Sequence, residues 1–90
     1  MKTQRASADH RTLELQKRLG ERVRDLRLRA GFGQEPFADH CNLHRVYVSD
    51  LERSQKNATL DALSKVATGL KMTISELFEG LGPGPSRRNP

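Results

Sequence analysis

The fold is decided by one stretch of the chain, QEPFADHCNLHRVYVSDL, which covers residues 34–51. Two short runs with apolar residues at helical spacing lie on either side of Asn42. For two helices to meet at a steep angle through so short a link, one residue must adopt the left-handed conformation. Glycine adopts it most easily, and asparagine is the usual second choice. We therefore interpret Asn42 as the turn of a helix-turn-helix, with an ordinary helix C-cap as the alternative.

The neighbours of Asn42 favour the helix-turn-helix interpretation. Ala38 is small at the place where the two helices approach most closely, and a larger side chain there would push them apart. Residue types are also restricted at fixed distances from Gln34, the first residue of the unit. The restricted positions are Phe37, Ala38, Cys41, Asn42, Leu43, Val48 and Leu51. An unrelated pair of amphipathic helices would rarely satisfy all of them.

Composition narrows the classes of function. The 90 residues carry a net charge of +5 with a pI near 10.0, a balance that favours polyanionic partners. Cys41 is the one cysteine, so no intrachain disulfide can form, and a reducing cytoplasm is the expected location. No apolar run approaches the roughly 20 residues that span a membrane.

Residues 1–30 hold nine basic and four acidic groups, whereas residues 31–54 hold two basic and four acidic groups. Attraction to phosphate must therefore come largely from outside the helix-turn-helix itself.

Three segments are predicted along the chain. Residues 1–11 are polar and without periodicity, which predicts a flexible N-terminal arm. Residues 12–80 form the helix-turn-helix domain. Residues 81–90 are rich in glycine and proline, which predicts a flexible C-terminal tail.

The domain is predicted to be all-α with five helices, because no alternating strand pattern competes with the helical periodicity. Thr12 is the expected N-cap of the first helix, and the second and third helices are expected over residues 34–41 and 44–53. Thr59 caps the fourth helix, and the T-I-S-E sequence that starts at Thr73 matches a capping box at the start of the fifth. The apolar stripe of the first helix consists of Leu15, Leu19, Val23, Leu26 and Ala30.

Residues from about Leu19 to Gly80 resemble the DNA-binding domain of the XRE family, which includes phage Cro and repressor proteins. The resemblance lies in LRLRAGFGQEPFA, LHRVYVSDLER and ATLDALSKVATGLKMTISELF. It implies a five-helix, lambda-repressor-like domain, and a short single-domain chain is also similar in layout to the controller proteins of restriction–modification systems. Gly33 stands where the family often has a Ser or Thr cap, and Asn42 replaces the commoner glycine. Neither departure changes the expected fold.

A helix-turn-helix places the N-terminal part of its second helix against base edges in the major groove. The expected base-reading residues are Arg45, Val46, Ser49 and Asp50. Arg45 can donate two hydrogen bonds to O6 and N7 of guanine, and Val46 can pack on a thymine methyl group. Ser49 can donate or accept, and Asp50 either accepts from a cytosine amino group or repels phosphate. The alternative for Arg45 is a solvated surface arginine.

Further residues are expected to contact phosphate. Gln34 resembles the family residue that binds a phosphate and supports the third helix, which we call the reading helix. The backbone N–H groups at the N-terminus of the second helix would assist Gln34. Lys2, Arg5, Arg11 and Arg29 could add non-specific attraction. The remaining phosphate candidates are Tyr47, Arg53, Lys56 and Asn57. The alternative for Tyr47 is a packing role with its hydroxyl at the surface.

Two other groups of residues are expected to be structural. Arg27 and Glu52 resemble an ion pair that ties the reading helix to the first helix in this family. His40, Cys41 and His44 form an H-C-x-x-H sequence that would permit metal binding. In the helix-turn-helix motif, however, the position of Cys41 belongs to the core, and the two histidines fall on separate helices. No metal site and no cofactor are therefore expected.

A homodimer is expected, because one such unit reads too few base pairs and two-fold dimers read palindromic sites. The C-terminal helices hold more apolar residues than a core of this size needs. The expected dimer residues are Leu70, Met72, Ile74, Leu77, Phe78 and Leu81. The alternative is that all of them close the core of the monomer.

The leading hypothesis is a sequence-specific regulator of transcription that binds double-stranded DNA as a homodimer. It would block RNA polymerase or contact it from an upstream site. The alternative is an antitoxin-like module that binds a partner protein and its own promoter. An enzyme is not expected, since the sequence has no nucleophile–base pair, carboxylate dyad or phosphate-binding loop.

Overall fold

The computed structural model describes residues 10–81, and within them the chain forms five helices and no strand. The helices are α1 (His10–Arg29), α2 (Gln34–Cys41), α3 (Arg45–Glu52), α4 (Leu60–Gly69) and α5 (Ile74–Leu77). The expected all-α, five-helix class is confirmed. Most of the predicted arm, with Lys2 and Arg5, and nearly all of the predicted tail lie outside the described residues.

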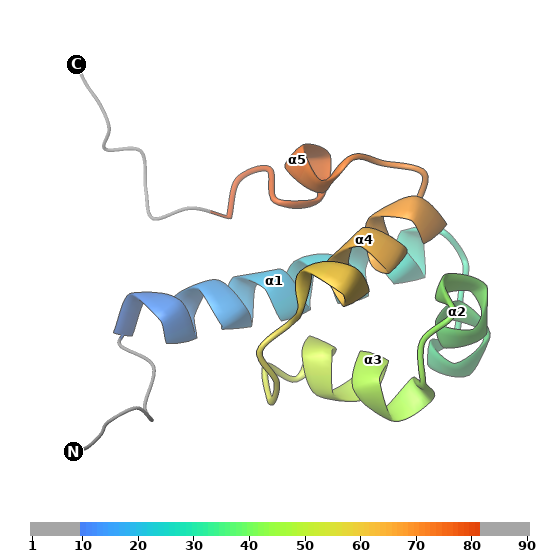
Figure 1. Ribbon diagram of the computed structural model, residues 1–90, viewed down its shortest axis with the longest axis horizontal. Helices are drawn as coiled ribbons and strands as arrows, with labels where there is room; N and C mark the ends of the chain where they lie inside the picture. The colour runs from blue at the N-terminus through green and yellow to red at the C-terminus, as the bar shows by residue number, and fades with distance from the viewer. Residues whose placement is uncertain (1–9, 82–90) are drawn as a thin grey trace.

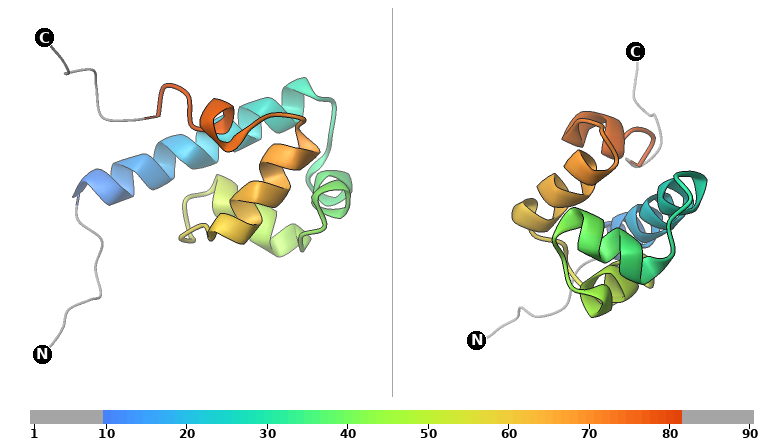
Figure 2. Two further views of the ribbon diagram at one scale, coloured as in Figure 1. Left: turned by 45° about the horizontal axis from the view of Figure 1, so that its top comes forward. Right: turned by 90° about the vertical axis from the view of Figure 1, so that its right-hand side faces the viewer.

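The helices surround one small core. In Figure 1, α1 runs along the molecule, α3 lies below it, α2 closes one end, and α5 lies above. Helix α3 packs against α1 and α2, and α4 packs against α2 and α5 (Figure 2). The largest fully buried side chains are Val23, Phe37, Val48, Leu51, Val66 and Leu77. The N-terminal turns of α1 extend beyond the other helices (Figure 1).

The boundaries of α1 differ from the prediction. The helix already includes His10, so Thr12 lies inside it and the expected N-cap at Thr12 is wrong. His10 and Arg11 are helical and do not belong to an irregular arm. Leu15 is 37% exposed, and Ala30 follows the helix in an exposed turn. Only the middle of the apolar stripe meets the core, because α1 is longer than the helices that pack on it.

The turn between α2 and α3 has the predicted conformation. Asn42 lies in the left-handed region with φ 59° and ψ 46°. Its N–H donates to the carbonyl of Asp39 at 3.1 Å, and the N–H of Leu43 donates to the carbonyl of Ala38 at 2.8 Å. Ala38 itself is 1% exposed. These bonds satisfy the carbonyls of Ala38 and Asp39 in the last turn of α2 and lead the chain into α3.

The other helix ends follow local sequence signals. Thr59 caps α4, since its side chain accepts a hydrogen bond from the N–H of Ala62 at 3.0 Å. Thr73 and Glu76 form the capping box of α5 through reciprocal bonds of 3.0 and 2.8 Å. Gly33 gives α2 no side-chain cap, as expected. Helix α3 is one residue shorter at each end than predicted, because its flanking residues serve as its caps.

Two glycines permit close helix contacts. A Cβ atom on Gly20 would lie 2.6 Å from the carbonyl oxygen of Leu51, so α1 meets the backbone at the end of α3 directly. A Cβ atom on Gly69 would lie 2.5 Å from the Sγ atom of Cys41, where α4 meets α2. Burial in this contact raises the pKa of the Cys41 thiol to about 11.

Across residues 10–81, the structure has no helix with the length and hydropathy needed to cross a membrane.

Candidate nucleic-acid interface

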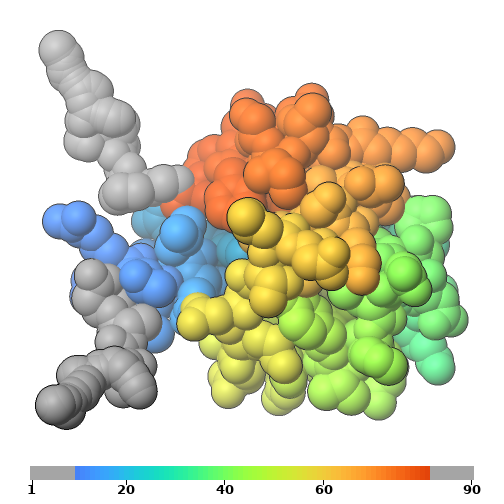
Figure 3. Space-filling view, viewed as in Figure 1, coloured from blue at the N-terminus to red at the C-terminus, as the bar shows by residue number. Residues whose placement is uncertain are grey.

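Helix α3 presents one of its faces to solvent and buries the opposite face. Val48, Leu51 and Glu52 are buried against the core, whereas Arg45 is exposed and Val46 is 57% exposed. The helix therefore lies at the surface of the domain, along the lower edge in Figure 3. Such an arrangement leaves the N-terminal part of α3 free to meet another molecule.

Ser49 and Asp50 lie at the boundary of this face. Both are half-buried. The carboxylate of Asp50 accepts a hydrogen bond from Nη2 of Arg53 at 2.9 Å. The Arg53 side chain is 65% exposed, so the pair lies at the edge of the surface. This positive partner reduces the repulsion that Asp50 alone would exert on a phosphate.

A buried ion pair fixes α3 to α1. Nε of Arg27 lies 2.6 Å from Oε2 of Glu52, and Nη2 lies 3.0 Å from Oε1. Nη1 of Arg27 also donates to the carbonyl of Phe32 at 2.8 Å, so all three guanidinium nitrogens have acceptors. The hydrogen bond to Glu52 raises the pKa of Arg27 and keeps it charged. The ion pair expected from the resemblance is thus present.

Gln34 joins the same network. Its Nε2 atom donates to Oε1 of Glu52 at 3.2 Å. Glu52 therefore receives hydrogen bonds from both α1 and the start of α2. Gln34 braces α3 in the described structure, and its contact with phosphate stays a prediction.

The connection between α3 and α4 carries most of the phosphate candidates. The hydroxyl of Tyr47 accepts from the N–H of Thr59 at 3.2 Å, and Nζ of Lys56 lies 5.1 Å from the centroid of the Tyr47 ring. Lys56 and Asn57 are exposed. Tyr47 is thus half-buried, and its hydroxyl and its ring both contact residues of this connection.

The first helix also holds this connection, which the sequence did not reveal. Nε2 of Gln16 donates to Oδ1 of Asn57, and the hydroxyl of Ser54 donates to the carbonyl of Gln16 at 3.3 Å. Ser54 has a φ of 62°, in the left-handed region. These contacts join residues about forty positions apart, so no local pattern could have indicated Gln16.

The predicted dimer residues divide into two groups. Leu77 is fully buried and Leu81 is 6% exposed, and both belong to the core of the monomer. Including them in a dimer surface was wrong, because their side chains are already covered by this chain. Ile74 is 39% exposed, and Leu70, Met72 and Phe78 are half-buried. We call these four residues the α4–α5 apolar surface.

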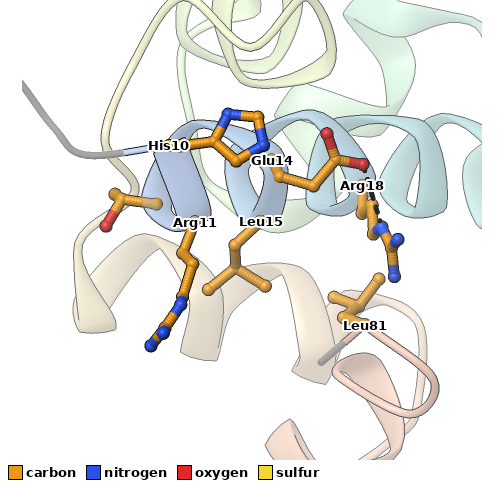
Figure 4. A pocket seen from close by; sticks show the side chains of 7 residues that line it. His10, Arg11, Glu14, Leu15, Arg18 and Leu81 are labelled. Atoms are coloured by element: carbon orange, nitrogen blue, oxygen red, sulfur yellow. Dashed lines mark hydrogen bonds and ion pairs between the residues drawn. The ribbon is translucent and has the colours of Figure 1, made fainter. Parts of the chain in front are cut away.

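A hollow lies beside the N-terminal half of α1. It has a volume of about 470 Å³ and is closed on one side by Leu81. The side chains of α1 that line it are His10, Arg11, Thr12, Glu14, Leu15 and Arg18. Leu15 and Leu81 face each other across it, and Glu14 is paired with Arg18 at 3.2 Å (Figure 4). None of its lining residues comes from α2 or α3, so it is separate from the exposed face of α3.

The H-C-x-x-H sequence does not bring its side chains together as a metal site. Nε2 of His40 lies 2.9 Å from the carbonyl oxygen of Gly69, and its ring stacks on Phe32 with centroids 4.8 Å apart. Cys41 is buried behind it. Over residues 10–81, no group of three or more His, Cys, Asp or Glu side chains is placed to hold a metal ion.

Comparison with known proteins gives a consistent result. The family model described as a helix-turn-helix domain matches residues 18–79. The control protein C.BamHI of Bacillus amyloliquefaciens is 38% identical over 61 residues, which cover 67% of this chain and 75% of that protein. The control protein C.MunI of a Mycoplasma species is 37% identical over 65 residues, covering 71% and 88%.

A solved structure shows the same similarity in three dimensions. The restriction-modification controller protein C.AhdI from Aeromonas hydrophila matches with a TM-score of 0.68 and 40% identity. The match covers 70% of this chain and 96% of that one. The chain therefore belongs to the XRE-type helix-turn-helix family, and within it the chain is similar to restriction–modification controller proteins.

Proposed function

We propose that this protein is a sequence-specific DNA-binding regulator of transcription that acts as a homodimer on a palindromic operator. The observation that carries the proposal is the exposed N-terminal face of α3, with Arg45 and Val46 at the surface. The buried pair of Arg27 and Glu52 holds this face in place. The control and controller proteins named above support the same function.

In this proposal α3 enters the major groove. Arg45 donates two hydrogen bonds to O6 and N7 of a guanine, which discriminates against other bases by about 1–3 kcal/mol. Val46 packs on a thymine methyl group, and Ser49 adds a weak preference. Asp50 accepts from a cytosine amino group, because its pairing with Arg53 favours this role over repulsion of phosphate.

Contacts with phosphate fix the register of α3 on the duplex. Gln34 and the backbone N–H groups at the start of α2 bind one phosphate. The connection after α3 binds the backbone on the other side of the groove. Its contacts come from Tyr47, Arg53, Lys56 and Asn57. These residues supply affinity and carry little sequence information.

Two copies joined through the α4–α5 apolar surface would place their α3 helices about 34 Å apart, one turn of B-DNA. A bound dimer would block RNA polymerase at an overlapping promoter or contact it from an upstream site. The protein would therefore act in the cytoplasm, in contact with the DNA.

The salt dependence of binding tests the electrostatic part of the proposal. For roughly 6–10 phosphate contacts, the affinity should fall by about 10³–10⁵ between about 50 and 200 mM salt. Fluorescence anisotropy with a labelled operator measures this slope, and light scattering on the same sample reports the mass. Binding that does not change with salt would overturn the proposed phosphate contacts. A monomer at micromolar concentration would overturn the homodimer.

A further inference from the structure

Helix α5 is a single turn, Ile74–Leu77, and it carries part of the α4–α5 apolar surface. So short a helix has little intrinsic stability, so its orientation depends on tertiary contacts. One contact is the Leu77 side chain, which is fully buried in the core. Phe78, which follows the helix, packs against the core, and Leu81 is 6% exposed, so these apolar contacts also restrain the position of α5.

Arg22 of α1 supplies a polar contact to the end of the same helix. Its Nη2 atom donates to the carbonyl of Glu76 at 2.7 Å, and its Nε atom donates to the carbonyl of Leu77 at 3.1 Å. Arg22 is half-buried, so these charged hydrogen bonds are partly shielded from water. A planar guanidinium that binds two successive carbonyls fixes both the distance and the rotation of the helix end. Its positive charge also suits a helix C-terminus.

We propose that Arg22 is a positioning residue that sets the α4–α5 apolar surface relative to the reading helix. This inference rests on the homodimer proposed above. One stretch of α1 holds both elements: Gly20 and Arg27 contact α3, and Arg22, between them, contacts α5. The separation of the two α3 helices in a dimer is therefore set through α1. Arg22 makes the operator spacing strict through its contacts with α5.

Arg22→Met tests this role, because methionine keeps much of the apolar stem and removes both donors. Loosening α5 in the monomer means that dimerisation has to order it again. The dissociation constant of the dimer should therefore rise about tenfold or more, given the usual strength of charged hydrogen bonds. Affinity for a duplex with a single half-site should stay unchanged, since α3 is not altered. Arg24→Met, at an exposed arginine on the same helix, is the matched control and should leave both constants unchanged.

The preference for one spacing of the half-sites distinguishes this role from a purely structural one, which would leave that preference unchanged. Operators with one base pair added or removed between the half-sites should bind the parent much more weakly than the original operator. Arg22→Met should show a smaller difference among the three duplexes. Sedimentation equilibrium measures the dimer constant, and anisotropy measures the three affinities.

The outcomes separate the two proposals. If the parent itself is a monomer, the proposed homodimer fails and the role of Arg22 fails with it. If the parent is a dimer and Arg22→Met dimerises as tightly with the same spacing preference, the role of Arg22 alone is overturned. Should Arg22→Met lose helical content, Arg22→Lys decides the matter, because lysine keeps the charge but has no planar pair of donors. A weaker Arg22→Lys dimer with parental half-site affinity supports the inference, and parental dimer affinity overturns it.

Discussion

Arg27 and Glu52 show how single residues hold α3 and its exposed face. Both are buried, and the guanidinium satisfies one carboxylate and one backbone carbonyl at the same time. A buried charge is tolerated only when it is paired, so each residue of the pair requires the other. Glu52 is the last residue of α3, so the pair fixes the C-terminal end of this helix. The N-terminal end, with Arg45, faces solvent.

Replacing Arg27 alone should therefore be strongly destabilising. Arg27→Met leaves the Glu52 carboxylate buried without its main partner, and the free energy of unfolding should fall by about 3–5 kcal/mol. Urea denaturation measures the change. Arg29→Met is the control, because Arg29 pairs with Asp25 at the surface and should contribute at most about 1 kcal/mol.

The double variant with methionine at both positions 27 and 52 should recover much of the lost stability, since no unpaired charge then remains. If Arg27→Met were as stable as Arg29→Met, the ion pair would not be what secures α3. That outcome would also weaken the claim that α1 determines where the reading helix lies.

At the scale of elements, the turn between α2 and α3 depends on the backbone conformation of one residue. Asn42 has a φ of 59°, which glycine adopts freely and β-branched residues avoid. Asn42→Gly should leave the midpoint of thermal unfolding nearly unchanged. Asn42→Val should lower the free energy of unfolding by about 1–2 kcal/mol. Equal stability of the two variants, measured by circular dichroism, would show that the left-handed turn is not required.

The connection after α3 depends on α1 through Gln16. Its side chain donates to Asn57, which orders a segment that is proposed to bind phosphate, whereas its backbone carbonyl accepts from Ser54 and is kept in an alanine variant. Gln16→Ala should weaken operator binding a few-fold, because a loosened connection must be ordered on binding. The salt dependence should not change, since Gln16 carries no charge.

Lys56→Gln is the matched variant for Gln16→Ala. It removes a proposed phosphate contact, so it should lower the slope of log affinity against log salt by about one for each copy. Anisotropy titrations at several salt concentrations distinguish the two effects. Parental affinity of Gln16→Ala would mean that the connection needs no support from α1.

These elements also show which features can be predicted from the sequence. Caps were predictable because their signals are local: Thr59, the capping box at Thr73 and the turn at Asn42 each depend on residues within a few positions. The start of α1 was missed because the helix extends beyond the core that produces its apolar periodicity. Gln16 and Arg22 were missed because their partners are distant in the sequence, at Asn57 and in α5.

The apolar residues near the C-terminus illustrate a different limit. Hydrophobicity alone does not tell whether a side chain covers the core of its own chain or awaits a second copy. Leu77 and Leu81 were predicted for the dimer surface, but they belong to the core, whereas Ile74 is exposed. Only the packing of α5 on the rest of the domain separates these cases.

For the whole molecule, the features converge on one arrangement. The long helix α1 contacts α3 through Gly20 and Arg27, the connection after α3 through Gln16, and α5 through Arg22. Helix α3 and helix α5, which carries part of the α4–α5 apolar surface, are therefore both held by α1. In a domain so small, such sharing would let the proposed homodimer present its two α3 helices with a defined separation.

The most direct test of this account is a selection of binding sequences from a random pool of duplex DNA, run in parallel with the parent and with Arg45→Ala. The parent should enrich a motif of two inverted half-sites. Arg45→Ala should enrich a motif that has lost the preference for guanine at one position in each half-site, with overall affinity reduced in line with the loss of a bidentate contact, about 1–3 kcal/mol. An identical motif for both proteins, or no enriched motif for the parent, would contradict the claim that the exposed face of α3 reads DNA.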